Sequence, residues 1–264
     1  DIWWGGTGDP HLQAAEEGLT EPYESPMLAK LHPWAIKQHE TGKGATVGVY
    51  LGALGYGYNS ELLEQKKIAA PACWADLIKP EFKGEVQVAN PNSSGTAYTF
   101  LATMVQILGE EEAFKYMKAL DGNINQYTKS GAAPAQAAAR GETLVGIAFQ
   151  HDVITPTITS NAPIKNVSPC EGTGFEIGSM SIIKGAPNME NAKKWYDWAL
   201  TPEAQMLGAA ANSYQNPSNM EAPIPDAAPK MADIKLIDYD FAKFGSSAER
   251  KRLLSRWDAE IGAK

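Results

Sequence analysis

The sequence is short of cysteine and histidine, and no part of it is a long apolar run. A transmembrane helix needs roughly 18 or more consecutive apolar residues, and no stretch approaches that length. Basic residues are in the minority, because 23 Lys and Arg stand against 31 Asp and Glu, for a net charge of −8. Proteins that bind nucleic acid present a basic face, so we expect no nucleic-acid partner. An anion site in this chain must therefore depend on local N–H groups and hydroxyls.

The two cysteines, Cys73 and Cys170, each lie in a turn that contains proline. In a cytosolic protein such a pair is typical of two buried thiols, and in an exported protein it is typical of one disulfide. No histidine stands at zinc-ligand spacing from either cysteine. The sequence also has no HExxH motif and no EF-hand loop, so it predicts neither a metal site nor another cofactor.

The patterns that are present alternate between strand and helix, which predicts an α/β fold with largely parallel sheets. The length of 264 residues suits one large or two modest domains. Strands are predicted at 1–4, 46–52, 55–59, 85–89, 125–127, 144–149 and 176–183, and helices at 10–18, from 60, 96–109, 110–120, 130–141, 188–200, from 202, and 248–260.

Four polar stretches follow predicted strands: GGTG at 5–8, NSSGT at 92–96, KSG at 129–131 and FQHD at 149–152. Ligands of open α/β sheets bind outside the carboxyl ends of the strands. Four polar loops in this one position are a stronger indication of a binding site than any one of them alone.

Ser94, Gly95 and Thr96 stand where a strand passes into a helix. Hydroxyls and glycine are ordinary helix-capping residues, and they are also what holds an oxyanion on the free N–H groups of a first helical turn. No Gly-Lys-Ser/Thr follows, so the stretch is not a P-loop. Ser130 and Gly131 form a second helix start of the same kind, with the same two interpretations.

His151 and Asp152 follow a buried strand, and Glu176 lies in a glycine-rich strand start. These side chains could bind sugar hydroxyls, and His151 with Asp152 could also assist catalysis or ligate a metal. The alternatives are a solvated loop for Asp152 and a surface position for Glu176. A hydrolase triad is excluded by the lack of a GxSxG motif. Four aromatic residues could stack on a sugar or could belong to the core: Trp3, Trp4, Tyr56 and Tyr58.

The order and spacing of several blocks resemble periplasmic substrate-binding proteins of ABC importers, in the ferric-iron-binding-like branch of the type II (Venus flytrap) fold. The blocks are DIWWGG, NPNSSGTAYTF, QYTKSGAAPAQAAARGE, GIAFQHD, PCEGTGFEIGSMSIIKGAPN, WYDWA with TPEAQ, and RLLSRWDAE. The resemblance implies two lobes that close on a ligand, with residues 1–49 and 178–223 in the first lobe and 50–177 and 224–264 in the second. It further implies a periplasmic monomer that is not an enzyme and that delivers its ligand to an ABC permease in the inner membrane.

The resemblance also concerns the start of the chain and its cysteines. Members of this branch carry a further βαβ unit before the DIWWGG block, so about sixty N-terminal residues of the first lobe are expected to be absent from this sequence. Because the resemblance places the protein in an oxidising compartment, it implies a disulfide between Cys73 and Cys170.

The ligand expected from the resemblance is an organic phosphate or phosphonate. Iron-binding members have adjacent tyrosines where this chain has His151 and Asp152, and they have a glutamate near Gly6. The loss of these hard ligands argues against Fe(III), whereas His-Asp with SSGT resembles the hexose-phosphate and phosphonate carriers. The alternatives are a ferric carrier with altered ligands, and a phosphoryl-handling enzyme with His151 as acid–base. The expected contacts are Ser94, Gly95, Thr96, Ser130 and Gly131 for the phosphoryl group, His151, Asp152 and Glu176 for hydroxyls, and Gly6 and Thr7 from the first lobe.

Overall fold

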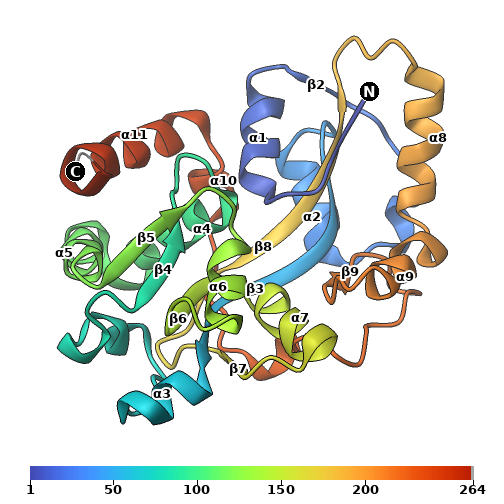
Figure 1. Cartoon of the computed structure of the whole chain (residues 1–264). Helices are drawn as coiled ribbons and strands as arrows, with labels where there is room; N and C mark the ends of the chain where they lie inside the picture. The colour runs from blue at the N-terminus through green and yellow to red at the C-terminus, as the bar shows by residue number, and fades with distance from the viewer. Residues whose placement is uncertain (263–264) are drawn as a thin grey trace. The chain divides into compact units, whose positions relative to one another are not determined.

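The computed structural model describes residues 1–262 and has a mixed α/β fold (Figure 1). Two compact units are present. Unit 1 comprises Asp1–Gly52, Glu176–Ala228 and Asp240–Lys251, and unit 2 comprises Ala53–Phe175, Pro229–Tyr239 and Arg252–Lys264. The unit boundary therefore falls inside two long strands, and residues 240–251 group with unit 1. The lobe boundaries expected from the sequence stay a prediction.

Unit 1 is built on a small, mainly antiparallel sheet. Strand β8 (Phe175–Ile183) pairs antiparallel with β1 (Ile2–Trp4) and β2 (Thr20–Glu21). The first part of β3 (Val47–Asn59) pairs antiparallel with β9 (Asn216–Pro217). The helical segments of this unit are α1 (Gly8–Glu16), η1 (Leu28–Lys30), α2 (Pro33–Thr41), α8 (Met189–Ala199), α9 (Pro202–Ala210), α10 (Phe241–Phe244) and the start of α11 (Ser247–Trp257).

The core of unit 1 forms because α2 and α8 turn small and apolar residues toward the sheet. Ala35 of α2 and Ala192 and Tyr196 of α8 pack with Val47 of β3 and Met180 of β8. Each of these side chains is almost completely removed from water. Apolar burial of this kind is the main favourable term in folding.

Unit 2 contains the parallel strands. Strand β4 (Val86–Ala89) pairs parallel with both β5 (Ile124–Thr128) and β6 (Val145–Phe149). The second part of β3 pairs antiparallel with β6 and with β7 (Ile164–Val167). The helical segments of this unit are α3 (Ser60–Lys66), η2 (Trp74–Ile78), η3 (Pro80–Phe82), α4 (Gly95–Leu108), α5 (Glu110–Asp121), α6 (Ala133–Ala139), α7 (Gln150–Ser160), η4 (Met231–Asp233), the end of α11 and the π-turn η5 (Asp258–Gly262).

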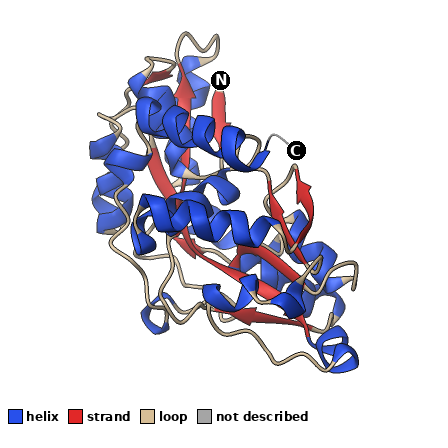
Figure 2. Cartoon of the chain, turned by 90° about the vertical axis from the view of Figure 1, so that its left-hand side faces the viewer, coloured by secondary structure: helices blue, strands red, loops and turns tan. Residues whose placement is uncertain are grey.

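The α/β class predicted from the sequence is confirmed, but the expectation of largely parallel sheets was wrong. Parallel pairing joins β4 to β5 and β6, whereas β3 pairs antiparallel with its partners β6, β7 and β9. Helices alternate with strands along much of the chain, which is why the pattern suggested crossovers throughout. Figure 2 shows the helices in blue and the strands in red.

Three local expectations also need correction. The strands predicted at 46–52 and 55–59 form one 13-residue strand, β3, because its glycines keep extended geometry. The helix predicted from Ser130 begins at Ala133 instead, with Pro134 in its first turn. Residues 150–152 were expected in a loop, and they form the first turn of α7.

The predicted disulfide between Cys73 and Cys170 is present, with 4.8 Å between the two Cα atoms. The two residues are 97 positions apart in the sequence, and both belong to unit 2. Closing a loop of this length stabilises the folded state by about 4–5 kcal/mol in the chain-entropy account. The carboxylate of Glu171 next to the bridge accepts hydrogen bonds from the Trp74 and Ala75 N–H groups, so the bridge also fixes the start of η2.

Within residues 1–262, none of the helices combines the length and the apolar character that a membrane-spanning helix requires.

Candidate anion-binding site

Two polar loops of unit 2 lie side by side because their strands do. Parallel pairing sets Ala89 of β4 opposite Thr128 of β5, so the residues that follow each strand emerge at the same sheet edge. Two hydrogen bonds then join the loops: the Asn90 N–H donates to the Thr128 carbonyl (2.8 Å), and Ser93 Oγ donates to the Lys129 carbonyl (3.1 Å). The loops at 93–96 and 129–131 are called the cradle below.

Gly131 is the closest point between the two loops. A Cβ atom added to Gly131 would lie 2.1 Å from Thr96 Oγ1 and 2.9 Å from Ser94 Oγ, which is well inside van der Waals contact. A side chain at residue 131 would therefore displace both hydroxyls. The glycine leaves the two hydroxyls converging on one small area at the start of α4.

The first turn of α4 partly satisfies its own N–H groups. Ser94 is the N-cap, and its Oγ accepts a long hydrogen bond from the Ala97 N–H (3.4 Å). The capping interpretation of Ser94 is thus correct, and the Ala97 N–H is already used. The N–H groups of Gly95 and Thr96 have no acceptor within an α-helix, because they belong to its first turn. They carry the partial positive charge of the helix dipole, which favours an anion.

Ser130 is exposed, and its backbone is fixed by its neighbours. Its carbonyl accepts hydrogen bonds from Thr128 Oγ1 (2.8 Å) and from the Ala133 N–H (3.3 Å). The Ser130 hydroxyl therefore stands on a rigid turn and remains accessible to a ligand.

His151 and Asp152 lie in the first turn of α7, directly after β6. The His151 side chain is 8% exposed, and Nε2 lies 3.7 Å from Oδ2 of Asp152, which is 28% exposed. The His151 ring stacks on Phe149, with 5.6 Å between ring centroids. Because β4 and β6 are parallel neighbours, α7 starts at the same sheet edge as the cradle.

Burial controls the charge of this pair. Desolvation lowers the pKa of His151, and the neighbouring Asp152 only partly offsets that shift. Desolvation also raises the pKa of Asp152, with His151 acting in the opposite direction. At neutral pH the imidazole is therefore neutral and offers one donor and one acceptor, as does a sugar hydroxyl. Asp152 also has a structural role, since an acidic residue in the first turn of a helix stabilises that helix.

The remaining predicted site residues belong to unit 1. Gly6 is exposed, with φ +83°, in the turn between β1 and α1. Thr7 is the N-cap of α1 and is 5% exposed, and its Oγ1 has no hydrogen-bond partner among residues 1–262. Glu176 is 3% exposed in β8, so the surface interpretation of this residue was wrong.

Sequence reasoning missed His11, which holds the turn that contains Gly6. His11 Nε2 lies 3.1 Å from the Gly5 carbonyl and Nδ1 lies 2.8 Å from Ser181 Oγ, while the ring stacks on Trp3 at 3.8 Å. Burial lowers the pKa of His11 to about 4, despite the opposing contact with the Gly5 carbonyl. A histidine six residues after the start of a diglycine turn is too general a pattern to have revealed this contact.

The aromatic residues differ in their availability. Tyr56 is fully buried and belongs to the core, so the sugar-stacking interpretation of this residue was wrong. Trp3 stacks on His11, and the 48%-exposed Trp4 meets Trp195 edge to face at 4.9 Å. Tyr58 is partly exposed in β3.

An open α/β sheet with hydroxyls and helix N-termini gathered at one edge is an arrangement that is able to hold an anion. The sequence profile of the bacterial extracellular solute-binding proteins matches residues 7–244, so the chain belongs to that family.

Three known proteins illustrate what this chain is similar to. The periplasmic binding protein AfuA of Actinobacillus pleuropneumoniae, solved with exogenous fructose-6-phosphate bound, is 46% identical. Its TM-score is 0.95, over 100% of this chain and 83% of AfuA. An uncharacterised Haemophilus influenzae protein is 45% identical over 99% of this chain and 76% of its own length. The apo ferric ion-binding protein A of Pasteurella haemolytica has the same fold at 17% identity, with a TM-score of 0.80 over 98% of this chain and 81% of that one. The predicted family, branch and type II fold are thereby confirmed.

Proposed function

We propose that this chain is the periplasmic solute-binding component of an ABC importer and that it captures a phosphorylated small organic ligand, a sugar phosphate or a phosphonate. The observation that carries the proposal is the packing of Gly131 against Thr96 and Ser94 at the start of α4. This packing assembles hydroxyls and unused helix N–H groups in one place, and a phosphoryl group has the charge and the acceptors that they require.

The relatives support the same ligand class. The solved neighbour with 46% identity and a TM-score of 0.95 held a hexose phosphate. The net charge of −8 supports recognition by placed donors in place of a basic surface.

Each expected contact has a separate role. Ser94, the Gly95 N–H, Thr96, Ser130 and Gly131 form the phosphoryl subsite. Neutral His151, together with Asp152, binds ligand hydroxyls, and Asp152 as an acceptor selects for donors.

Gly6, Thr7 and Glu176 of unit 1 are proposed as further contacts to the ligand. Thr7 Oγ1 is a buried hydroxyl without a partner in the described part of the chain, and a ligand oxygen would satisfy it.

The proposal extends to the setting of the protein. A disulfide between Cys73 and Cys170 suits an oxidising compartment such as the periplasm. The partner is an ABC permease in the inner membrane, and the protein acts as a monomer that binds and releases its ligand unchanged. The proposal includes no catalytic step and no resident cofactor.

The test is a calorimetric titration of the purified protein with four probes: fructose-6-phosphate, fructose, inorganic phosphate and Fe(III) citrate. We expect fructose-6-phosphate to bind at least about a hundredfold more tightly than fructose, because two or more charge-assisted hydrogen bonds are involved. Equal affinity for fructose and its phosphate would contradict the proposal. Tight Fe(III) binding with a colour change would favour the ferric carrier instead.

A further inference from the structure

The first residue of α7, Gln150, has a buried side chain whose nitrogen and oxygen both have protein partners. It is 1% exposed. Its Nε2 donates to the Leu54 carbonyl (3.1 Å), and its Oε1 accepts from Asn166 Nδ2 (2.9 Å) and from Ser168 Oγ (3.2 Å). One amide therefore joins the start of α7 to β3, to β7 and to the residue that follows β7.

The orientation of this amide is fixed by its partners. The Leu54 carbonyl can only accept, so the nitrogen of Gln150 must face it and the oxygen must face Asn166 and Ser168. Space for the side chain comes from Gly55 of β3. A Cβ atom at residue 55 would lie 2.9 Å from Gln150 Cγ and 2.5 Å from the Val167 carbonyl oxygen.

Gln150 anchors the start of α7 to the sheet without capping it, because none of its side-chain partners is an N–H group of the helix. The N-cap of α7 is Phe149, whose side chain makes no cap hydrogen bond. The start of the helix is therefore fixed by the Gln150 side chain, which is anchored to two strands. His151 and Asp152 are the next two residues, so a rotation of this first turn moves both of them together.

We propose that Gln150 is a positioning residue of the ligand site, whose three hydrogen bonds set the direction in which α7 presents His151 and Asp152. This inference rests on the proposed function, which gives those two side chains a ligand. It adds a residue that touches no ligand and that sets specificity through its neighbours.

The substitution Gln150→Glu tests the role sharply because its effect depends on protonation. A neutral carboxyl group has the shape of the amide and can donate to the Leu54 carbonyl while it accepts from Asn166 and Ser168. A carboxylate cannot donate, and it would face a carbonyl oxygen in a buried place. Burial raises the pKa of such a carboxyl group. The introduced carboxyl group should therefore restore the native contacts as the pH falls, and Gln150→Leu should not restore them at any pH.

Wild type and variants have their other titrating groups in common, so we compare the variant-to-wild-type ratio of affinities at each pH, which removes the part of the pH dependence that those groups contribute equally to both proteins. The same holds for the phosphate of the probe. The ionisable groups on the elements packed around residue 150 are His151 and Asp152 of α7, Lys165 of β7, and Tyr50, Tyr56 and Tyr58 of β3.

The experiment measures fructose-6-phosphate affinity by calorimetry from about pH 5.5 to pH 8 for wild type, Gln150→Glu and Gln150→Leu. We expect Gln150→Glu to bind about tenfold or more weakly at the upper pH and to approach wild type at the lower one. Gln150→Leu should stay weak throughout. Because Asn166 is exposed, Asn166→Ala removes one of the three bonds without endangering the fold, and it should weaken binding a few-fold. A variant-to-wild-type ratio that does not change with pH would overturn the proposal.

A matched control is Gln205→Glu. Gln205 of unit 1 also has a two-sided network, since Nε2 donates to Ser218 Oγ and Oε1 accepts from the Asn219 N–H. It lies on none of the elements that carry the site, so its affinity ratio should be independent of pH. Gln205 is only partly buried, and a ratio that changes with pH as in Gln150→Glu would show a general effect of an introduced carboxyl group and would overturn the proposal.

A second readout separates this inference from the proposed function. The chain has four histidines, and a His151→Asn spectrum identifies the imidazole NMR signal of His151. In Gln150→Glu this signal should leave its wild-type position at high pH and return to it at low pH. If wild type does not bind fructose-6-phosphate, the proposed function fails and this signal alone decides the role of Gln150. An unchanged signal in both Gln150 variants would refute that role.

Discussion

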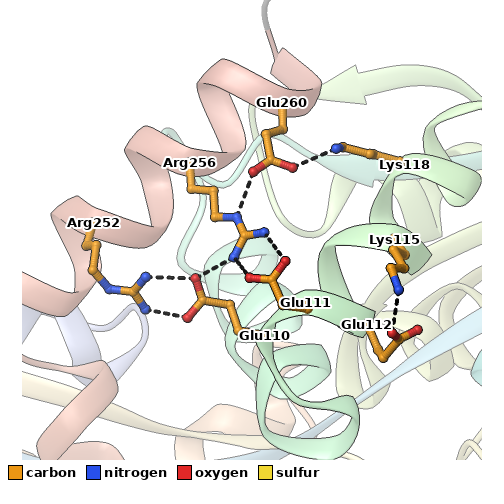
Figure 3. Close-up of polar contacts among 8 residues, drawn as sticks. All are labelled: Glu110, Glu111, Glu112, Lys115, Lys118, Arg252, Arg256 and Glu260. Atoms are coloured by element: carbon orange, nitrogen blue, oxygen red, sulfur yellow. Dashed lines mark hydrogen bonds and ion pairs between the residues drawn. The ribbon is translucent and has the colours of Figure 1, made fainter.

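Two polar regions of unit 2 are built in opposite ways. Six charged side chains form the ion-pair network that holds the C-terminal segment against α5: Glu110, Glu111, Lys118, Arg252, Arg256 and Glu260 (Figure 3). The cradle at 93–96 and 129–131 has only Lys129 as an ionisable residue, and it consists otherwise of hydroxyls, glycines and backbone N–H groups.

The difference shows in how each region satisfies its polar groups. In the network, Arg256 reaches Glu110, Glu111 and Glu260 at 2.7–2.8 Å and lies 4.2 Å from the centre of the Phe114 ring. These charges are neutralised within the protein. In the cradle the Gly95 and Thr96 N–H groups have no acceptor within α4, and under the proposed function they bind the phosphoryl group. Charge thus holds the chain in one region, whereas the proposed site in the other consists mainly of uncharged donors.

The largest expected effect comes from filling the gap at Gly131. The substitution Gly131→Ala adds a Cβ atom within 2.1 Å of Thr96 Oγ1, so the hydroxyl must move. We expect fructose-6-phosphate affinity to fall about a hundredfold, which corresponds to two charge-assisted hydrogen bonds. Because the added atom would also lie 2.6 Å from Thr96 Cβ, we expect the free energy of unfolding to fall by about 1–3 kcal/mol. The control is Gly122→Ala after α5, where a Cβ atom meets its nearest neighbour at 3.2 Å, and it should leave the affinity unaltered.

Breaking the ion-pair network should affect the stability of the fold and not the affinity for the ligand. Arg256→Met removes its ion pairs but keeps an apolar stem on Phe114. We expect the free energy of unfolding to fall by about 1–2 kcal/mol, since a partly buried network exceeds an isolated surface pair. Ligand affinity should not change. Lys115→Met, which breaks only the exposed pair with Glu112, is the control and should have almost no effect. A large loss of affinity in Arg256→Met would show that the two regions are coupled.

Acid should weaken the network over a defined range. The guanidinium groups of Arg252 and then Arg256 lower the pKa of Glu110 from 4.5 to about 2. The unfolded chain therefore takes up a proton before the folded chain does, and the stability from Glu110 is complete above about pH 4.5 and lost as the pH falls toward about 2. Solvent screens the interaction of Glu110 with the two arginines. We therefore expect Glu110→Gln to reduce the acid-induced loss of stability by only about 1 kcal/mol. The loss is measured as the difference between the free energies of unfolding at neutral pH and at about pH 3. In the control Glu112→Gln this difference should be the same as in wild type.

The smallest expected effect is on association rates. The net charge of −8 repels a phosphate ester at a distance, and salt screens that repulsion. Raising the salt from about 0.05 to 0.5 M should therefore increase the association rate a few-fold. A decrease would show that cationic side chains attract the ligand. The variant Lys129→Met would then identify whether Lys129 is responsible.

Part of this arrangement could be predicted from the sequence. Ser94 and Thr96 belong to a local pattern, in which capping residues and glycine follow a strand, and local patterns survive in the fold. The gathering of polar loops at one sheet edge was expected from the rule that ligands bind at the carboxyl ends of strands, and the pairing of β4 with β5 is what brings Gly131 to Thr96.

The first turn of α7 could not be predicted in this way. The helix α7 as a whole contains Pro156 and several β-branched residues, which are poor helix formers. The helix exists because tertiary packing overrides these preferences: Val153 and Ile164 meet at Gly57 of β3, where a Cβ atom would lie 2.6 Å from each of them. The anchoring of Gln150 depends on partners far away in the sequence, which no local pattern contains.

The proposed binding of a phosphoryl group at the start of α4 is tested most directly by calorimetry with fructose-6-phosphate. The two variants to compare are Thr96→Val and Thr99→Val. Both changes remove one hydroxyl from α4 with little change in shape. The Thr99 hydroxyl is buried and has no hydrogen-bond partner among the described residues, so it serves as the matched control. We expect Thr96→Val to weaken binding by about ten- to a hundredfold and Thr99→Val to leave it unchanged. Equal affinities for the two variants and wild type would mean that Ser94, Gly95 and Thr96 only begin a helix.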